Sequence, residues 1–354
     1  MLLMLALHLL NDGYLNHFKL IKLLEYAMQS FFITQQQVAH AKQLFTHALC
    51  QRLQLIEVQA PLSLVIGSGM QDTLSGSEQA VQFAIRSNGE RHEVVHSLAK
   101  WKRALLADYQ AQVGQGIVAQ MRALRPDEER LSERHSVLVE QWDWEQVIDA
   151  EQRTIATLQQ RVQQIYRALL DTLTALGDPA DLLPSLPAQV YFIDSESLRQ
   201  RYPQLTAKQR EQAITEQHKV VFVIGIGGLL SDGSRHDGRA PDYDDWSTST
   251  ELAGAGLNGD LLVWHPGLAD ALELSSMGIR VDAQALRRQC AQQQCLQVLQ
   301  QPWHQRLLSG QLPATIGGGI GQSRLAMWML QQTHISAVQA AEISFNTEPQ
   351  IAVA

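Results

Sequence analysis

Residues 231–280 read SDGSRHDGRAPDYDDWSTSTELAGAGLNGDLLVWHPGLADALELSSMGIR. This segment carries nine carboxylates and three arginines but no lysine. Asp260 precedes the strand-like run LLVWH, Glu273 begins ELSSMGIR, and most of the other carboxylates crowd a loop rich in Gly, Pro and Asp. Carboxylates at this density repel one another unless a cation compensates them. Mg²⁺, which binds carboxylates together with phosphate oxygens, or a substrate amine would supply that charge; a solvated acidic loop is the alternative.

A glycine-rich run lies further along the chain, where residues 317–330 read GGGIGQSRLAMWML. Glycines let the backbone approach a nucleotide closely, and Arg324 begins an apolar run with a helical pattern. An arginine at the start of a helix can bind a phosphate through two parallel hydrogen bonds. A glycine-rich turn that only caps the helix is the alternative. Together with the acidic segment, this run indicates a nucleotide–metal site.

The composition bounds the class of protein. The chain has 354 residues, of which 45% are hydrophobic, and a net charge of −8. It can bury a sizeable core, and the acidic balance argues against a dedicated nucleic-acid binder. The cysteines lack the spacing of metal ligands, so we expect a reducing cytoplasm. The apolar run MLLMLALHLL is too short to span a bilayer. We interpret residues 1–27 as a non-native or unstructured extension, with Met28 as the expected start and a signal peptide as the alternative, and residues 28–354 as a single domain.

Hydrophobic periodicity and capping residues predict the helices. They are expected over residues 34–54 with a cap at Thr34, and over residues 155–176, 206–218, 282–300 and 303–308. Strands are expected over residues 55–66 with a break at Pro61, 189–193 and 219–227, and as a hairpin over residues 121–145 that carries Arg125. Strands interleaved with helices predict one α+β domain.

The run EVVHSLAKWKRALL, residues 93–106, is interpreted as a strand followed by a turn. It presents four polar or basic side chains beside apolar strand residues: Ser97, Lys100, Lys102 and Arg103. This cluster is either a solvated edge or a site that binds a carboxylate.

Several long motifs together resemble the ammonia-dependent asparagine synthetase (aspartate–ammonia ligase) family. The motifs are LIEVQAP, TLSGSEQAVQF, EVVHSLAKWKR, MRALRPDEERLS, HSVLVEQWDWE, GIGGLLSDGSRHDGRAPDYDDWST, GLNGDLLVW, ELSSMGIRVDA and TIGGGIGQSRL. The resemblance implies the catalytic fold of class II aminoacyl-tRNA synthetases, an antiparallel sheet flanked by helices, in a homodimer. LIEVQAP resembles the first class II motif, the hairpin after Arg125 the second, and the glycines before Arg324 the third.

The resemblance also implies the reaction. The side-chain carboxylate of L-aspartate attacks the α-phosphate of ATP to give β-aspartyl-AMP and pyrophosphate, and ammonia then displaces AMP to give asparagine. Attack of one anion on another needs neutralised charge and precise positioning. The expected ATP and Mg²⁺ contacts are the phosphate-binding Arg125 and Arg324, the metal ligands Asp260 and Glu273, and the nucleotide-binding Ser136, Val139 and Ser276.

The remaining roles concern aspartate and ammonia. Aspartate is expected to contact Ser97, Lys102, Gln141, Asp143, Arg239, Asp244 and Arg280, although Arg239 and Arg280 could instead pair with phosphate. Asp72 is our candidate for holding ammonium and accepting its proton, because ammonium is not nucleophilic until it is deprotonated; binding of the substrate amine is its alternative role. Three further acidic residues could act at the site or only support the loops: Asp127, Glu128 and Asp245.

Two other functions remain as alternatives. An aspartyl- or asparaginyl-tRNA synthetase would need a tRNA-binding domain before the catalytic core, and the segment between Met28 and the first motif is too short for one. A catalytically silent paralogue that serves as a regulatory subunit should have lost its phosphate-binding arginines or metal carboxylates, and the sequence retains both sets. We see no cysteine nucleophile of an amidotransferase, so free ammonia is the expected nitrogen donor.

Overall fold

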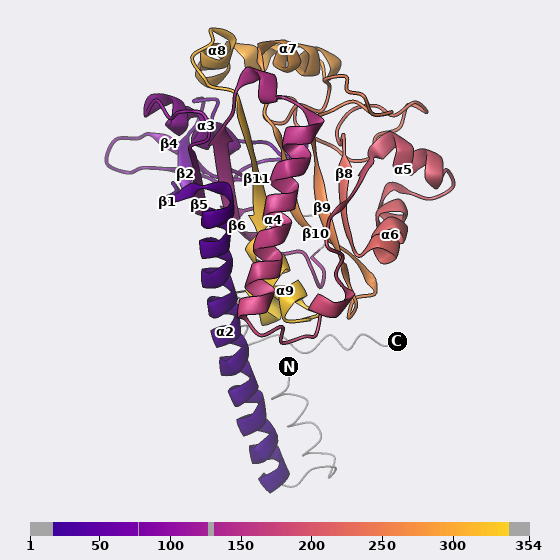
Figure 1. The fold of residues 1–354 in the computed structure, drawn as a ribbon. Coiled ribbons are helices and arrows are strands. Elements are labelled where there is room, and N and C mark those ends of the chain that lie inside the picture. Colours follow the sequence, from indigo (N-terminus) through magenta and orange to yellow (C-terminus); the bar gives the residue numbers. More distant parts are fainter. Residues whose placement is uncertain (1–16, 77, 127–130, 340–354) are drawn as a thin grey trace.

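The computed structural model describes residues 17–76, 78–126 and 131–339, with side chains from Ser30 onward. Its centre is a sheet of eight strands in the order β1-β5-β6-β11-β10-β9-β8-β7 (Figure 1). Neighbouring strands run antiparallel except at the two edges, where β1 pairs with β5 and β7 with β8 in parallel. The strands are β1 (Leu55–Val58), β5 (Gly116–Leu124), β6 (Leu138–Val147), β7 (Tyr191–Asp194), β8 (Val220–Ile224), β9 (Asn258–His265), β10 (Asp270–Ile279) and β11 (Thr315–Gly321).

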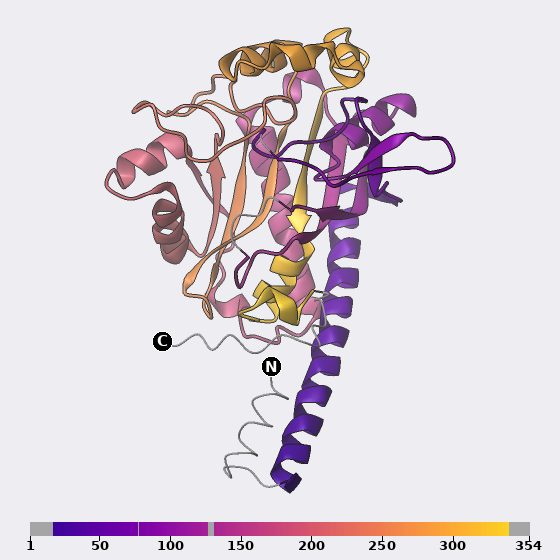
Figure 2. The same ribbon diagram turned by 180° about the vertical axis from the view of Figure 1, so that it is seen from behind.

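Helices flank this sheet, which confirms the predicted α+β architecture. The longer helices are α2 (His17–Leu53), α3 (Ala99–Asp108), α4 (Ile155–Ala175), α6 (Ala207–His218) and α7 (Ala283–Gln292), and the shorter ones α5 (Ser195–Arg201), α8 (Pro302–Leu308) and α9 (Gln322–Met329). Helix α4 lies across one face of the sheet beside α2, and the view from behind exposes the other face (Figure 2). A second sheet of three strands comprises β2 (Ser63–Val65), β4 (Arg91–Val94) and β3 (Gln82–Ala84). No helix of the described part is long and apolar enough to cross a membrane.

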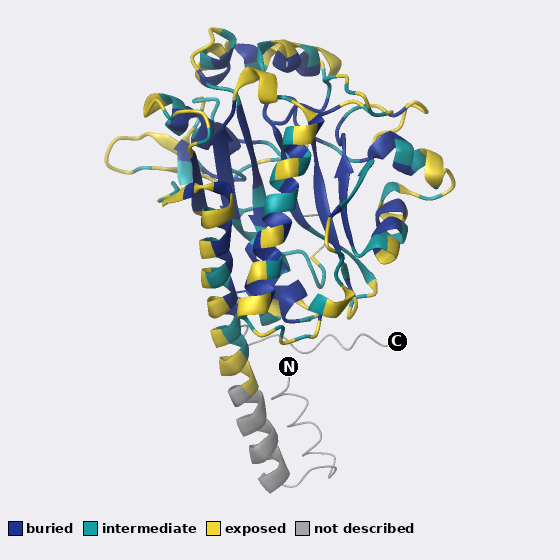
Figure 3. Ribbon diagram, viewed as in Figure 1, coloured by how far each residue is buried: buried dark blue, intermediate teal, exposed yellow. Residues whose placement is uncertain are grey.

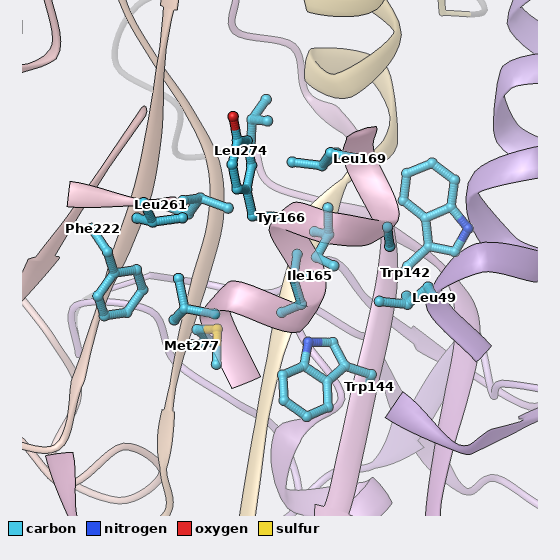
Figure 4. Close-up of a cluster of buried hydrophobic side chains, with 14 of the residues drawn as sticks. Leu49, Trp142, Trp144, Ile165, Tyr166, Leu169, Phe222, Leu261, Leu274 and Met277 are labelled. Carbon is cyan, nitrogen blue, oxygen red and sulfur yellow. The ribbon is translucent and has the colours of Figure 1, made fainter. Parts of the chain in front are cut away.

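The main core lies between the sheet and helix α4 (Figures 3 and 4). Trp142 and Trp144 of β6 and Met277 of β10 are fully buried there against Ile165 of α4. The apolar stripe of α4 recurs at three- and four-residue spacing, and Thr154 caps the helix by accepting the amide N–H of Thr157 at 3.2 Å. The predicted helix over residues 155–176 and the hairpin of β5 and β6 are therefore confirmed.

Three local predictions are wrong. Thr34 does not begin a helix, because α2 begins at His17 and continues through it. Residues after Ser97 form helix α3 and not a turn, so Lys102 projects from a helix. The helix predicted to Gln300 ends at Gln292, and the left-handed backbone of Gln294 (φ 55°) separates it from a short 3₁₀ helix.

The glycines before Arg324 form strand β11 and not a turn. A Cβ atom on Gly318 would collide with Met277, and one on Gly319 would lie 2.5 Å from the Gln141 Oε1 atom. Glycine is therefore required because neighbouring strands pack closely against β11, and the structure explains this run without a special backbone conformation.

The break at Pro61 is confirmed as the end of an edge strand. Strand β1 stops at Val58, before the proline, and pairs only with β5 in the described structure. Ile56 and Leu62 on either side of this end are exposed over 70% and 62% of their surface. The motif LIEVQAP and the residue that follows it thus place apolar side chains at an open sheet edge.

Candidate active site

A cavity of about 430 Å³ opens on the face of the sheet that α4 leaves uncovered. Strand β6 shows how the sequence builds it. Its side chains alternate, so Trp142 and Trp144 enter the core whereas Gln141 and Asp143 line the cavity. Strands β10 and β11 and the acidic loop at Asp237–Asp244 complete the wall.

Most of the predicted site residues meet in this cavity. Those that line it are Ser97, Arg125, Ser136, Val139, Gln141, Asp143, Arg239, Asp244, Glu273, Ser276, Arg280 and Arg324. Three do not: Asp72, Lys102 and Asp260 are buried behind its wall. Asp245 is buried and ion-paired with Arg153 at 2.6 Å, whereas Asp127 and Glu128 lie outside the described residues.

Two arginines at one end of the cavity are bonded mainly to backbone. Arg125 donates to the His96 carbonyl at 3.0 Å, and Arg324 donates to the Glu273 carbonyl at 3.1 Å. Partial burial lowers the pKa of Arg125, and the positive charge of Arg324 lowers it further. Two guanidinium groups that repel each other across a cavity favour an anionic ligand between them.

The opposite wall holds a closed network of charges. Arg280 donates to both carboxylate oxygens of Glu145, the closest at 2.7 Å, and to Asp244. Burial opposes ionisation of Glu145, but the charges of Arg280 and Lys102 and the hydrogen bonds to this carboxylate together outweigh burial and lower the pKa of that carboxyl. All three side chains are buried, so these charges are fixed in place by one another.

Lys102 belongs to the same network. Its ammonium contacts the Asp143 carboxylate, donates to the Trp144 carbonyl at 2.8 Å and lies 3.8 Å from Glu145. The side chain is fully buried. Lys102 therefore sets the position and charge of Asp143, which does face the cavity, and its predicted contact with aspartate stays a prediction.

Two carboxylates, those of Asp260 and Glu273, lie near Arg239. Both oxygens of Asp260 accept from Arg239, at 2.6 and 2.5 Å. Burial raises the pKa of Asp260 to about 6 against the opposing charge of Arg239, and the charge of Glu273 adds to the rise. The two predicted metal ligands are thus close enough to repel each other. Glu273 lines the cavity and fits Mg²⁺, which takes one or two carboxylates and completes its shell with phosphate oxygens and water. Asp260 could join it only by releasing an oxygen from Arg239. Within the described residues no group of three or more His, Cys, Asp or Glu could hold a metal by itself.

Asp72 is buried beside α3, and only 1% of its surface is exposed. Its Oδ2 atom accepts the backbone N–H of Lys100 at 3.4 Å, and its Oδ1 atom lies 4.0 Å from the Lys100 ammonium. Burial raises the pKa of Asp72 to about 6, and Lys100 only partly offsets the rise. A carboxylate of this kind can exchange a proton near neutral pH.

Sequence reasoning missed several residues that line the cavity, among them Lys208, Tyr243 and Arg134. Lys208 comes from α6, which was interpreted only as a capped helix, and it pairs with Glu211 at 3.0 Å. Tyr243 donates to the Leu74 carbonyl at 3.1 Å and holds the loop before β3 against the acidic loop. The position of Tyr243 within APDYDDW was the available signal, since it lies between carboxylates of the site.

Comparison with known proteins gives independent evidence. A family model described as aspartate–ammonia ligase matches residues 32–352. The fold is similar to asparaginyl-tRNA synthetase from Pyrococcus horikoshii complexed with asparaginyl-adenylate, with a TM-score of 0.65 and 14% identity over 86% of this chain and 68% of that one. It is also similar to asparaginyl-tRNA synthetase from Entamoeba histolytica in complex with asparaginyl-adenylate (TM-score 0.61, 15% identity, 87% and 66% covered). The aspartyl-tRNA synthetase of Entamoeba histolytica follows with a TM-score of 0.57, 14% identity, and 88% and 57% covered. The chain spans about two thirds of the length of the two asparaginyl enzymes.

The fold and the charged cavity on the open face of the sheet define a class II aminoacyl-tRNA synthetase-like catalytic domain. The family match covers most of the sequence. The chain belongs to the aspartate–ammonia ligase family and is therefore an ATP-dependent enzyme that forms asparagine from aspartate and ammonia.

Proposed function

We propose that the enzyme works through a β-aspartyl-AMP intermediate formed in the cavity described above. One observation carries the proposal: Arg125 and Arg324, bonded mainly to backbone carbonyls, face a cavity whose other wall is a closed network of ion pairs. The first feature suits the phosphates of ATP and the second suits a small zwitterion.

The phosphate end would bind ATP. Arg125 and Arg324 would hold the phosphates, and Ser136, Ser276 and the Val139 backbone would contact the ribose or adenine. Asp260 and Glu273 would hold Mg²⁺, with Arg239 sharing the charge of Asp260. When bound, the ion would neutralise phosphate charge and ease departure of pyrophosphate.

The closed network would bind aspartate. Asp143, Asp244 and Gln141 offer acceptors to its α-ammonium group, and all three line the cavity. Ser97, Arg239 and Arg280 would contact its carboxylates, with Lys102 acting on them through Asp143 or directly. The side-chain carboxylate then attacks the α-phosphorus, the new P–O bond forms, and the bond to pyrophosphate breaks.

Asp72 would serve the ammonia step. Ammonium gives one proton to the Asp72 carboxylate and becomes ammonia. The nitrogen lone pair forms the C–N bond at the activated carbonyl, and the electron pair of the broken C–O bond leaves with AMP. The second proton passes from the amide nitrogen to solvent, and Asp72 returns its own proton to solvent before the next turnover.

We further propose that the enzyme is a cytoplasmic homodimer. The exposed Ile56 and Leu62 at the open edge beside β1 offer an apolar surface for a second copy. The three cysteines are free, which suits a reducing compartment.

The test uses the purified protein with ATP, Mg²⁺ and aspartate, with and without ammonium and with no tRNA. Production of AMP, pyrophosphate and asparagine that depends on ammonium is expected. Aspartate-dependent exchange of pyrophosphate into ATP without ammonium would support the adenylate. Formation of ADP and phosphate in place of AMP would contradict the proposed intermediate.

A further inference from the structure

Four titratable side chains form a buried cluster behind the cavity: Asp72, Lys100, Asp242 and His304. They come from the loop after β2, from α3, from the acidic loop and from α8. Their exposed fractions are 1%, 3%, 6% and 0%, respectively. The mechanism proposed above uses only Asp72, so the other three need an explanation.

Asp242 is the centre of this cluster. Its Oδ2 atom lies 2.7 Å from the Lys100 ammonium and 2.8 Å from the His304 Nε2 atom. A carboxylate only accepts, so Nε2 of His304 carries a proton. Trp303, the neighbour of His304, donates from Nε1 to the Lys100 carbonyl at 2.9 Å and fixes α3 against α8. The lysine ammonium is thus held on Asp242 from a defined direction.

Asp72 is left without a close cation. The Lys100 ammonium lies 4.0 Å from Asp72 Oδ1, and that oxygen has no hydrogen-bond partner among the described residues. The other charged or titratable groups that act on Asp72 are Asp143, Arg280 and Tyr243, besides Asp242 of the cluster, whereas His304 contacts Asp242. Asp143 and Asp242 reinforce the rise in the pKa of Asp72 that burial causes, whereas Lys100 and Arg280 oppose it.

We propose that Asp242 and His304 are positioning residues for the ammonia step, because they hold the Lys100 ammonium away from Asp72 and so preserve Asp72 as a proton acceptor. This inference rests on the proposed role of Asp72. If Lys100 closed the gap and formed a direct ion pair, Asp72 would remain ionised but would be a much weaker base. The arrangement therefore keeps the pKa of Asp72 high by pairing the Lys100 ammonium with Asp242.

The test compares two variants whose effects have opposite sign. Asp242→Asn removes a negative charge and frees Lys100 to approach Asp72, so the pKa of Asp72 falls. Lys100→Met removes the opposing cation, so that pKa rises. The acidic limb of the pH profile of kcat/KM for ammonium should therefore move to lower pH in Asp242→Asn and to higher pH in Lys100→Met, each by about one pH unit.

Two controls separate this effect from damage to the fold or to adenylate formation. Aspartate-dependent pyrophosphate exchange should stay within about threefold of the parent in both variants, since neither residue faces the phosphate end. Hydroxylamine, which is unprotonated at neutral pH, should accept the aspartyl group with little dependence on either variant. His304→Gln keeps a donor for Asp242 and should leave the limb in place, whereas His304→Leu should move it in the direction of Asp242→Asn.

The outcomes distinguish the inference from the proposed function. If Asp72→Asn abolishes asparagine formation but Asp242→Asn and Lys100→Met leave the limb unmoved, or move it the same way, the positioning role is overturned and the role of Asp72 stands. If Asp72→Asn forms asparagine at the parent rate, both are overturned. Should Asp242→Asn not fold, His304→Leu against His304→Gln gives the same decision.

Discussion

The two ends of the cavity use arginine in different ways. At one end Arg280 donates to the carboxylates of Glu145 and Asp244, and Lys102 is matched to Asp143. At the other end Arg125 and Arg324 hold backbone carbonyls, and the nearest carboxylate oxygen to Arg324, on Glu273, is 3.8 Å away. The first set of cations is neutralised within the protein, and the second is not.

This difference indicates what each end can do. A buried cation matched to carboxylates fixes the shape of the wall, and removing one partner leaves an uncompensated charge. A cation bonded to carbonyl oxygens retains most of its charge for a ligand. We call the wall of Arg280 and Lys102 the matched end, and the wall of Arg125 and Arg324 the open end. We therefore expect changes at the matched end to alter stability as well as aspartate binding, and changes at the open end to alter catalysis with little effect on stability.

The largest effect is expected from Lys102→Met at the matched end. The substitution leaves the buried Asp143 carboxylate without its cation, which should lower the free energy of unfolding by about 3–5 kcal/mol. Urea unfolding measures it. Lys42→Met is the matched control, because Lys42 also pairs with a β6 carboxylate, Glu140 at 3.0 Å, but 25% of its side chain is exposed.

The control should cost no more than about 1 kcal/mol. If Lys102→Met does not fold, the double variant Lys102→Met/Asp143→Asn should recover part of the loss, because it removes the unpaired charge. Equal unfolding midpoints for Lys102→Met and Lys42→Met would show that the buried Asp143 carboxylate does not need its cation for stability.

At the open end, Arg324→Ala should reduce aspartate-dependent pyrophosphate exchange by about 100- to 1,000-fold, since it removes a preorganised charge from the phosphates. The thermal unfolding temperature should change little, because Arg324 has no close carboxylate partner. Arg134→Ala is the matched control: Arg134 lines the same cavity but is ion-paired with Asp270 at 2.6 Å. Similar losses of exchange in both variants would show that an arginine paired with a carboxylate contributes as much to phosphate binding as one that is not.

The hairpin of β5 and β6 and helix α4 were predicted because they follow from local patterns, whereas the antiparallel sheet and the grouping of the open-end residues were expected from the family resemblance. Alternation in β6 puts Trp142 in the core and Gln141 in the cavity, and the apolar stripe of α4 recurs regularly from Ile155 to Leu173. Arg125 and Arg324 stand in motifs whose resemblance to a family is specific. Their meeting in one cavity agrees with that expectation.

The matched end could not be derived in the same way. Helix α3 looked like a turn because three cations lie within four residues, a pattern typical of exposed segments. Its cations are buried because their partners arrive from distant parts of the chain: Lys100 meets Asp242, and Arg103 donates to the Val281 carbonyl at 2.8 Å. The same limit applies to β11, whose glycines are explained by side chains of β6 and β10.

Asp72 extends the comparison to an anion that has no matched cation. The raised pKa of Asp72 means that ionisation of this carboxyl destabilises the folded state. The contribution of the protonated carboxyl to the free energy of unfolding is therefore fully present below about pH 4 and is lost as the pH rises through about 6. Asp72→Asn removes this penalty. Relative to the variant, the parent should lose about 1–3 kcal/mol of unfolding free energy over that window. Urea unfolding at a series of pH values measures the difference; a constant difference from pH 4 to 7 would show that Asp72 is matched after all.

The smallest effects should come from two glycines on the same face of β11. A Cβ atom on Gly317 would meet the Trp144 carbonyl at 2.5 Å and the Glu145 carboxylate, both held rigidly in the matched end. The three atoms nearest to a Cβ atom on Gly319 all belong to the Gln141 side chain, whose Cδ atom would lie 2.8 Å away and which can rotate aside. Gly317→Ala should therefore cost about 1–3 kcal/mol of stability, whereas Gly319→Ala should cost less and raise the KM for aspartate by displacing Gln141. Urea unfolding and steady-state kinetics of the two variants measure these effects. A larger loss of stability in Gly319→Ala than in Gly317→Ala would contradict the view that the matched end is the more rigid one.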